Sequence, residues 1–357
     1  MSRNTVARID LRAIRHNLAC VRQLAPDSRV ACVVKADGYG HGLSRICSAL
    51  KKADLLAVAT TGEGFVCREH GWQGRLLLLE GPNNRSELED IIELRADMVV
   101  HHRTQLDLLR QQSATPPGAL WLKIDTGMHR LGFPVDDVAA VHGELEQLRG
   151  PQPTVLMSHF ACADNRENPM TAGQIERFDA AIRGLDGPVS LANSAGILNF
   201  PDSHRDWVRP GIMLYGISPC GRERSTEIGL RPAMSLQCDL IAINSVRQGE
   251  TVGYGAEFVC PQDMRIGVAA IGYGDGYPRG ARSGTPVLVN GRRARLAGRV
   301  SMDMITIDLS GLEDARVGDR VTLWGEGLPI EEVAVWAQAI PYELICGVTA
   351  RVRSVAD

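Results

Sequence analysis

The sequence has no excess of positive charge and no long apolar segment, and each absence excludes a class of protein. A formal net charge of −3 offers no basic field to nucleic acid. No stretch approaches the roughly 20 apolar residues that span a bilayer, and residues 1–5 lack the apolar core of a signal peptide. We therefore expect no nucleic-acid partner and no membrane partner.

Paired cysteine motifs are also missing. The nine cysteines are odd in number, and none is arranged as C-x-x-C. Cys32 and Cys238 lie inside apolar runs, where cysteine behaves as a small hydrophobic residue. This pattern argues against a disulfide framework and against a zinc site, so we expect no metal and place the chain in the reducing cytoplasm.

What the sequence does contain, up to about residue 230, is a regular alternation of short apolar runs and longer amphipathic segments. The runs are continuous rather than alternating in polarity, as in parallel strands that are covered on both faces. A first helix is expected after an N-cap at Asp10, and further helices over residues 86–95, 135–148 and 173–185. The strand candidates are residues 29–35, 55–60, 75–80, 98–101, 120–125, 155–160, 189–193 and 208–215.

Eight such units predict an α/β fold that begins with a (β/α)8 barrel of the TIM type over residues 1–231. An open doubly wound sheet is the alternative. It calls for a G-x-G-x-x-G turn, and Gly38, Gly40 and Gly42 do not have that spacing. From residue 232 to 357, long helical patterns are absent until residues 330–339, and Asn290-Gly291 separates two runs as in a β-hairpin. The C-terminal domain is therefore predicted to be mostly β.

Lys35 is the most informative single residue. It follows the apolar run of residues 30–34 and begins a glycine-rich turn that ends at Gly42. A lysine amine held against a low-dielectric core has a lowered pKa and can act as a nucleophile, most often toward the aldehyde of pyridoxal phosphate (PLP). A solvated lysine after a strand is the simpler interpretation, and Lys35 alone does not decide between the two.

Polar residues also follow the other predicted strands, at the C-terminal ends where the catalytic groups of such barrels lie. Taken singly, each has a structural explanation: His159 as a core histidine, Ser194 as a helix N-cap and Arg209 as half of an ion pair. Their convergence on one face of one barrel favours a functional site. The segments are residues 125–130, 158–159, 193–194 and 209–212.

These segments and several others identify a family. The chain resembles bacterial alanine racemases, which are PLP enzymes of fold type III, over essentially its whole length. The tail R-V-R-S at residues 351–354 departs from the family pattern because it lacks a proline, which leaves the path of the last strand open. The matching stretches are V-V-K-A-D-G-Y-G-H-G from residue 33, W-L-K-I-D-T-G-M-H-R-L-G from 121, W-V-R-P-G-I from 207, V-G-Y-G from 252, G-Y-G-D-G-Y-P from 272, G-R-V-S-M-D-M from 298 and Y-E from 342.

The resemblance implies roles for the barrel residues. Lys35 would carry PLP, and Arg209, braced by His159, would face the pyridine nitrogen of the cofactor. Arg130 would bind the substrate carboxylate, and Lys123, which matches a lysine that is carbamylated in some members, would brace Arg130. The residues implied to hold the phosphate are Tyr39, Ser194, the amides of Gly211 and Ile212, and Tyr342, with Asn193 in support.

The resemblance also implies a homodimer in which each C-terminal domain completes the partner's active site. Tyr254, Tyr273, Met302 and Asp303 would reach that site from the partner subunit, with Met302 beside the substrate. Racemisation of alanine uses one base on each face of the α-carbon, so Lys35 is assigned the proton of D-alanine and Tyr254 that of L-alanine. The two tyrosines would exclude side chains much larger than methyl.

Three alternatives stay open. A fold-type III decarboxylase shares the barrel and the lysine but has no need of a second base such as Tyr254. A non-catalytic PLP carrier can be a lone barrel, whereas this chain adds a second domain. A cofactor-free Schiff-base aldolase would leave Ser194 and Gly211 with nothing to bind. The sequence also leaves open whether D-alanine is made for peptidoglycan or degraded in alanine catabolism.

Overall fold

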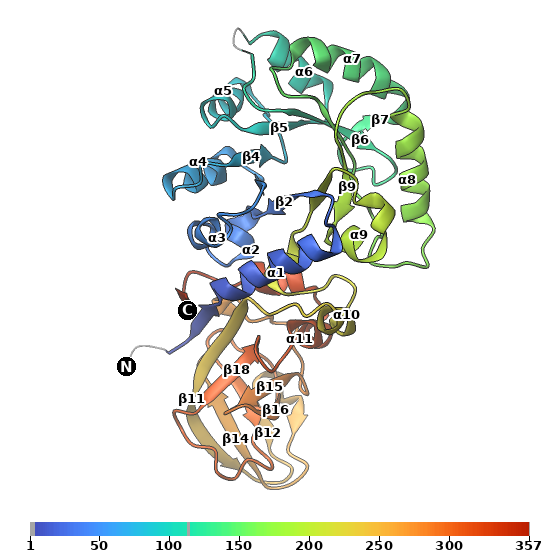
Figure 1. Cartoon of the computed structure of the whole chain (residues 1–357). Coiled ribbons are helices and arrows are strands. Elements are labelled where there is room, and N and C mark those ends of the chain that lie inside the picture. Colours follow the sequence, from blue (N-terminus) through green and yellow to red (C-terminus); the bar gives the residue numbers. More distant parts are fainter. Residues whose placement is uncertain (1–3, 113–114, 357) are drawn as a thin grey trace.

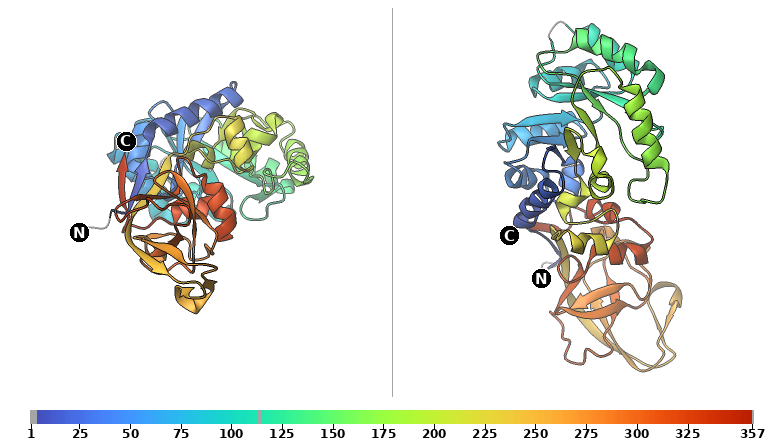
Figure 2. Two further views of the ribbon diagram at one scale, coloured as in Figure 1. Left: turned by 90° about the horizontal axis from the view of Figure 1, so that it is seen from below. Right: turned by 45° about the vertical axis from the view of Figure 1, so that its right-hand side comes forward.

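The protein has two parts stacked end to end, a barrel covered by helices and a β domain (Figures 1 and 2). The computed structural model describes residues 4–112 and 115–356. The first strand, β1 (Val6–Ile9), and the last, β19 (Arg353–Ala356), pair in parallel near the junction of the two parts. One hydrophobic core runs through both parts. Among the described residues, no helix is long and apolar enough to cross a bilayer.

The N-terminal part is a closed barrel of eight parallel strands, as predicted. The last barrel strand pairs with the first through Trp207 and Arg29, which closes the ring. Nearly all strand residues are buried, and this explains their continuous apolar runs. The strands are β2 (Arg29–Val33), β3 (Leu55–Val58), β4 (Arg75–Leu78), β5 (Asp97–Val100), β6 (Leu120–Asp125), β8 (Val155–Met157), β9 (Val189–Asn193) and β10 (Trp207–Arg209), with the short β7 (Phe133–Pro134) added to β6.

The last predicted strand, residues 208–215, is wrong beyond Arg209. Pro210 offers no N–H to continue the ladder, and Gly211 turns the chain with φ −115° and ψ −88°. Residues 212–215 then form a 3-10 turn, η3 (Ile212–Tyr215), whose side chains are all buried. A short buried run reads the same in either conformation, so periodicity alone could not separate them.

Helices connect the barrel strands. Asp10 caps the first of them as predicted, because its carboxylate accepts hydrogen bonds from the Arg12 and Ala13 amides at 2.7 and 3.1 Å. The helices are α1 (Leu11–Leu24), α3 (Leu43–Ala49), α4 (Thr61–Glu69), α5 (Arg85–Glu93), α6 (Arg103–Arg110), α7 (Val138–Leu148), α8 (Met170–Ala181) and α9 (Ser194–Asn199), with 3-10 turns η1 (Val135–Asp137) and η2 (Pro201–Ser203).

The C-terminal part is a mostly antiparallel β domain in which the sheet closes on itself through the pairing of β11 with β14. The predicted hairpin at Asn290-Gly291 is present, and both residues have the positive φ that a type I′ turn requires. The strands are β11 (Met234–Val246), β12 (Thr251–Val252), β13 (Phe258–Val259), β14 (Met264–Ala269), β15 (Pro286–Val289), β16 (Arg292–Leu296), β17 (Ile305–Asp308) and β18 (Arg320–Trp324).

The domain contains further short helices and one unexpected strand. β1 pairs with β11 and β19, so residues 6–9 lie in the sheet of the β domain rather than in the barrel, where residues 1–231 were expected. The tail that departs from the family pattern therefore ends in a regular strand. The helical elements are α10 (Arg222–Glu227), α11 (Ile330–Ala337), α12 (Pro341–Cys346), η4 (Tyr254–Ala256) and η5 (Tyr273–Asp275).

Candidate active site

A cavity of about 680 Å³ opens at the C-terminal ends of the barrel strands. Side chains from strands that are far apart in sequence meet there because parallel strands in a barrel end at the same rim. Most of the residues that the sequence singled out line this cavity: Lys35, Tyr39, Lys123, Arg130, His159, Asn193, Ser194, Arg209, Gly211, Ile212 and Tyr342.

The turn that carries Lys35 has an unusual backbone. In the segment labelled α2 (Lys35–Tyr39), residues Ala36 to Tyr39 all have φ between 52° and 61°, which is a left-handed turn. Each non-glycine residue in this conformation costs roughly 1–2 kcal/mol, so the surroundings must hold it. The Asp37 side chain does part of this, because it accepts a 2.7 Å hydrogen bond from the Leu43 amide. The turn places both Lys35 and Tyr39 on the cavity wall.

Glu63 is a second support of this turn, and sequence reasoning missed it. One carboxylate oxygen accepts from the Ala36 amide at 2.6 Å, and the other accepts from the Ala59 amide at 2.8 Å and the Thr60 amide at 3.3 Å. Glu63 thereby ties the residue after Lys35 to the loop after β3. The available signal was the capping box formed by Thr60 and Glu63 at the start of α4.

Arg209 lines the cavity and is buried, with 3% of its surface exposed. Its guanidinium donates to Ser190 Oγ and to the Ser158 carbonyl, both at 2.6 Å, and lies 3.4 Å from His159 Nδ1. Burial lowers the pKa of Arg209 to about 10, so the group stays charged at neutral pH. Burial and the nearby Arg209 charge hold the pKa of His159 well below its usual value, so a neutral His159 can accept from Arg209.

The cavity is rich in cations. Lys35, Lys123, Arg130 and Arg209 all line it, and Glu80 is the only carboxylate among the described residues of its wall. Burial, followed by the charges of Arg209, Arg130 and Lys35, lowers the pKa of Lys123 to about 8. A site with this charge is suited to an anionic ligand.

Lys35 itself differs from the expectation. The sequence suggested an amine held against the apolar core, but the Lys35 side chain is exposed in the single chain. Only its backbone continues from the buried strand β2. The single chain therefore does not by itself give the Lys35 amine a low-dielectric environment.

Another part of the cavity wall is built from hydroxyl groups and a close backbone turn. Ser194 Oγ accepts a 2.9 Å hydrogen bond from the Gly211 amide, which ties these two residues of the cavity wall together. Ser194 is the first residue of α9 and not its cap; Asn193 is the N-cap, accepting from the Gly196 amide at 2.9 Å. A Cβ atom at Gly211 would lie 2.5 Å from Tyr39 Oη, so a larger residue here would have to displace the Tyr39 hydroxyl.

These residues fit the phosphate end of PLP. Burial raises the pKa of Tyr342 to about 12 and also raises the pKa of Tyr39, so both hydroxyls stay protonated and can donate to an anion. The Tyr39 ring is held by stacking on Tyr215 at 4.8 Å between centroids. With Lys35 on another part of the same wall, one molecule that carries both an aldehyde and a phosphate matches the donor set.

The remaining predicted residues lie outside the cavity, on the β domain. Tyr254 is 70% exposed, Met302 52% and Tyr273 41%. Asp303 is half-buried and forms an ion pair with Arg351. The single chain therefore does not bring these residues to Lys35. Among the described residues, no group of three His, Cys, Asp or Glu side chains is placed to bind a metal ion.

Comparison with known proteins agrees with this picture. The family model of the alanine racemase N-terminal domain matches residues 9–219, and that of the C-terminal domain matches residues 233–356. The alanine racemase of Nitrosococcus oceani is 51% identical over 346 residues, covering 96% of this chain and 97% of that protein.

Solved structures of similar proteins cover the whole chain. The biosynthetic alanine racemase of Pseudomonas aeruginosa superposes with a TM-score of 0.96 at 47% identity, with all of both chains covered. An alanine racemase of Bartonella henselae with covalently bound pyridoxal phosphate has a TM-score of 0.90 at 25% identity, with 99% of each chain covered.

Proposed function

The chain belongs to the alanine racemase family, and on that premise we propose which residues carry out its reaction. The protein is a PLP-dependent isomerase that interconverts L-alanine and D-alanine. The observation that supports our assignment is the cavity that collects Lys35, Arg209, Ser194 and Tyr39 at the C-terminal rim of the barrel. Loss of optical activity, measured separately from L-alanine and D-alanine, tests the reaction. A yellow protein that converts neither enantiomer would instead favour a PLP carrier.

Cofactor binding is assigned to the cavity wall. Lys35 would hold PLP through its aldehyde, and the phosphate would be held by the hydroxyls of Tyr39, Ser194 and Tyr342 and by the Ile212 amide. The Gly211 amide would act through Ser194, to which it donates. Arg209 would lie on the side of the pyridine nitrogen, where its charge and its lack of an acceptor would disfavour protonation of that nitrogen.

Two groups move the α-proton. When bound, PLP withdraws electrons from the α-carbon of the amino acid, which makes its proton removable. Once the substrate amine has replaced Lys35 on the cofactor, the free Lys35 amine would take this proton from D-alanine, and the Tyr254 hydroxyl of the partner subunit would give one to the opposite face. From L-alanine the roles reverse: Tyr254 would take the proton and Lys35 would return one. Arg130 binds the substrate carboxylate and so fixes which faces the two bases meet, with Met302 beside the substrate.

Proton exchange into deuterated water distinguishes the two bases. A Tyr254→Phe enzyme should still exchange the α-proton of D-alanine, because Lys35 can remove and return it on one face. Exchange from L-alanine should be lost. NMR of the recovered alanine measures both rates. Equal loss for both enantiomers would contradict the assignment of one base to each face.

We propose a homodimer with shared sites. The exposure of Tyr254, Tyr273 and Met302 on the β domain, and the half-buried side chain of Asp303, support this proposal. Complementation tests it. A Lys35→Ala enzyme and a Tyr254→Phe enzyme are each inactive, but a mixed dimer contains one site with both native residues. Random mixing should restore about a quarter of the native activity, since half of the dimers are mixed and each has one good site. No recovery would place both bases in one chain.

We propose that Lys123 is carbamylated. The positively charged Lys123 amine repels the neighbouring Arg130, so Lys123 can brace Arg130 only if a modification makes its side chain negative. With a pKa lowered to about 8, a fraction of the amine is neutral near pH 7 and can attack carbon dioxide, losing a proton and forming a carbamate. The ¹³C NMR spectrum of enzyme in ¹³C-bicarbonate should show one carbamate resonance that a Lys123→Met variant lacks.

We propose that the enzyme works in the cytoplasm and supplies D-alanine for peptidoglycan. All nine cysteines are free thiols, as in a reducing compartment. The similar Pseudomonas aeruginosa enzyme is biosynthetic. Deleting the gene should make growth depend on added D-alanine, whereas a catabolic enzyme would leave growth on D-alanine-free medium unchanged.

A further inference from the structure

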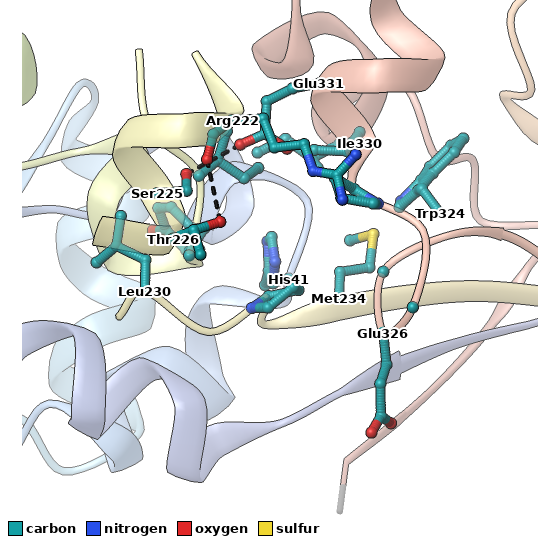
Figure 3. Close-up of a pocket in the computed structure, with 18 residues that line it drawn as sticks. His41, Arg222, Ser225, Thr226, Leu230, Met234, Trp324, Glu326, Ile330 and Glu331 are labelled. Atoms are coloured by element: carbon teal, nitrogen blue, oxygen red, sulfur yellow. Dashed lines mark hydrogen bonds between the residues drawn. The ribbon is translucent and has the colours of Figure 1, made fainter. Parts of the chain in front are cut away.

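A second cavity, of about 270 Å³, lies between the barrel and the β domain (Figure 3). It shares no lining residue with the cofactor cavity. His41 and Tyr215 reach it from the barrel, and Met234 and Trp324 reach it from the β domain. Its volume is several times one water molecule's share of the liquid, about 30 Å³, and is near the lower end of small-molecule sites, about 300 Å³.

His41 presents a hydrogen-bond acceptor to this cavity. The residue is fully buried, and its Nδ1 lies 2.8 Å from the Tyr39 carbonyl, which can only accept. Nδ1 therefore carries the proton. Burial lowers the pKa of His41 to about 4, so the ring is neutral at pH 7 and Nε2 has a free lone pair. Among the described residues, Nε2 has no hydrogen-bond partner.

Trp324 presents the complementary donor. It is 1% exposed, at the end of β18, and its ring stacks on Tyr277 at 6.1 Å between centroids. Its Nε1–H likewise lacks a partner among the residues that the structure describes. A buried polar group without a partner is rare and destabilising, so two of them facing one cavity indicate a ligand that satisfies both.

We propose that this interdomain cavity is a second binding site, which takes a small, neutral, planar molecule with one N–H donor for His41 and one acceptor for Trp324. Apolar contacts for the body of such a molecule come from Leu230, Met234 and Ile330. The charged side chains Arg222, Glu326 and Glu331 also line the cavity, and Glu331 is held by a 3.0 Å hydrogen bond from Ser225.

The site lies next to the cofactor-binding turn. His41 follows that turn directly, bonds the Tyr39 carbonyl and packs on Tyr215 at 4.6 Å between ring centroids. Tyr215 in turn stacks on Tyr39. A ligand on His41 is therefore separated by one side chain from a residue that holds the phosphate. The site is nevertheless distinct from the catalytic cavity, and its test does not depend on the catalytic assignments.

Indazole is a suitable probe because its ring carries an N–H donor beside an acceptor nitrogen, and indene is a matched control with the same shape and neither group. Isothermal titration calorimetry of the PLP-loaded enzyme with indazole should give a Kd on the order of 1 mM or tighter. Trp324→Phe, which keeps a ring but removes the donor, should weaken binding about tenfold. Indene should bind at least about tenfold more weakly than indazole.

Trp336→Phe is the matched control, because Trp336 is half-buried under Arg282 outside this cavity, and it should leave indazole binding unchanged. Equal affinity of the parent enzyme and Trp324→Phe, or equal binding of indene and indazole, would overturn the proposal. A crystal of the parent enzyme soaked in indazole needs no variant. Density for the compound between His41 and Trp324 supports the site, and its absence there overturns it.

Discussion

The cofactor cavity and the exposed face of the β domain contrast in how complete they are within one chain. In the cavity, Arg209 is buried and held by Ser190 and Ser158, and Ser194 is held by the Gly211 amide. On the β domain, Tyr254 and Met302 expose more than half of their surface. The cavity residues are thus held in place within one chain, whereas Tyr254 and Met302, which we propose act at the site of another copy, lie free on the surface.

Loss of the Tyr254 hydroxyl should have the largest effect on turnover. It should have almost no effect on the folding stability of the single chain. Positioned acid–base groups contribute about 10²–10⁴-fold, so Tyr254→Phe should slow racemisation of L-alanine by that factor. Because Tyr254 is exposed, the free energy of unfolding should stay within about 0.5 kcal/mol of the native value. Steady-state kinetics and urea unfolding measure the two effects. A large loss of stability would show that Tyr254 belongs to the fold of its own chain.

Gly211→Ala should disrupt the packing of the cavity wall within the single chain. The added Cβ would lie 2.5 Å from Tyr39 Oη and force Tyr39 away from Gly211, two residues that we propose lie at the phosphate. Overpacking of this kind costs about 1–3 kcal/mol, so we expect PLP affinity, measured by absorbance titration, to fall up to roughly a hundredfold.

Gly143→Ala is its control. Gly143 lies in α7 and has nothing within 4 Å of an added Cβ, so this variant should bind PLP like the native chain. Equal PLP affinity in the native chain, Gly211→Ala and Gly143→Ala would contradict the assignment of Gly211 to the phosphate site.

The charge on Lys123 should make stability depend on pH. Its pKa in the folded chain is about 8, below the usual 10.5, so between these values the unfolded chain binds more protons than the folded chain. The free energy of unfolding should therefore rise with pH from about 8 to 10.5, by at most about 1.4 kcal/mol per pH unit.

Other groups titrate in this range, so the quantity to compare is the difference between the native protein and Lys123→Met, both freed of bicarbonate. Urea unfolding at several pH values measures it. A difference that is flat with pH would mean that Lys123 is solvated rather than buried among cations.

Glu63→Gln should have the smallest effect and sharpens the role of the left-handed turn. The amide keeps the shape but has one acceptor oxygen, so either the Ala36 amide or the Ala59 amide loses its partner. We expect PLP dissociation to accelerate about five- to tenfold. Glu250→Gln is matched, because Glu250 accepts from the Arg247 amide in the β domain, and it should not alter PLP release. Equal rates in both variants would deny Glu63 this role.

The sequence predicted the parts of the structure that depend on local pattern. Continuous apolar runs identified the barrel strands, Asp10 marked the start of α1, and Asn290-Gly291 marked a hairpin. The resemblance then supplied the residues of the cavity. The errors lie where local pattern is ambiguous: the buried run after Arg209 forms a 3-10 turn, and β1 joins the sheet of the β domain.

The barrel, the β domain and the candidate residues of the cavity could be predicted from the sequence, because strand periodicity, turn residues and motifs lie in neighbouring positions. Tertiary structure alone decided three other features: the support of the Lys35 turn by Glu63, the exposure of Lys35 and Tyr254, and the meeting of His41 with Trp324 between the domains. Each depends on contacts between segments distant in the chain. Such contacts are set by how whole elements pack, and no short stretch of sequence specifies them.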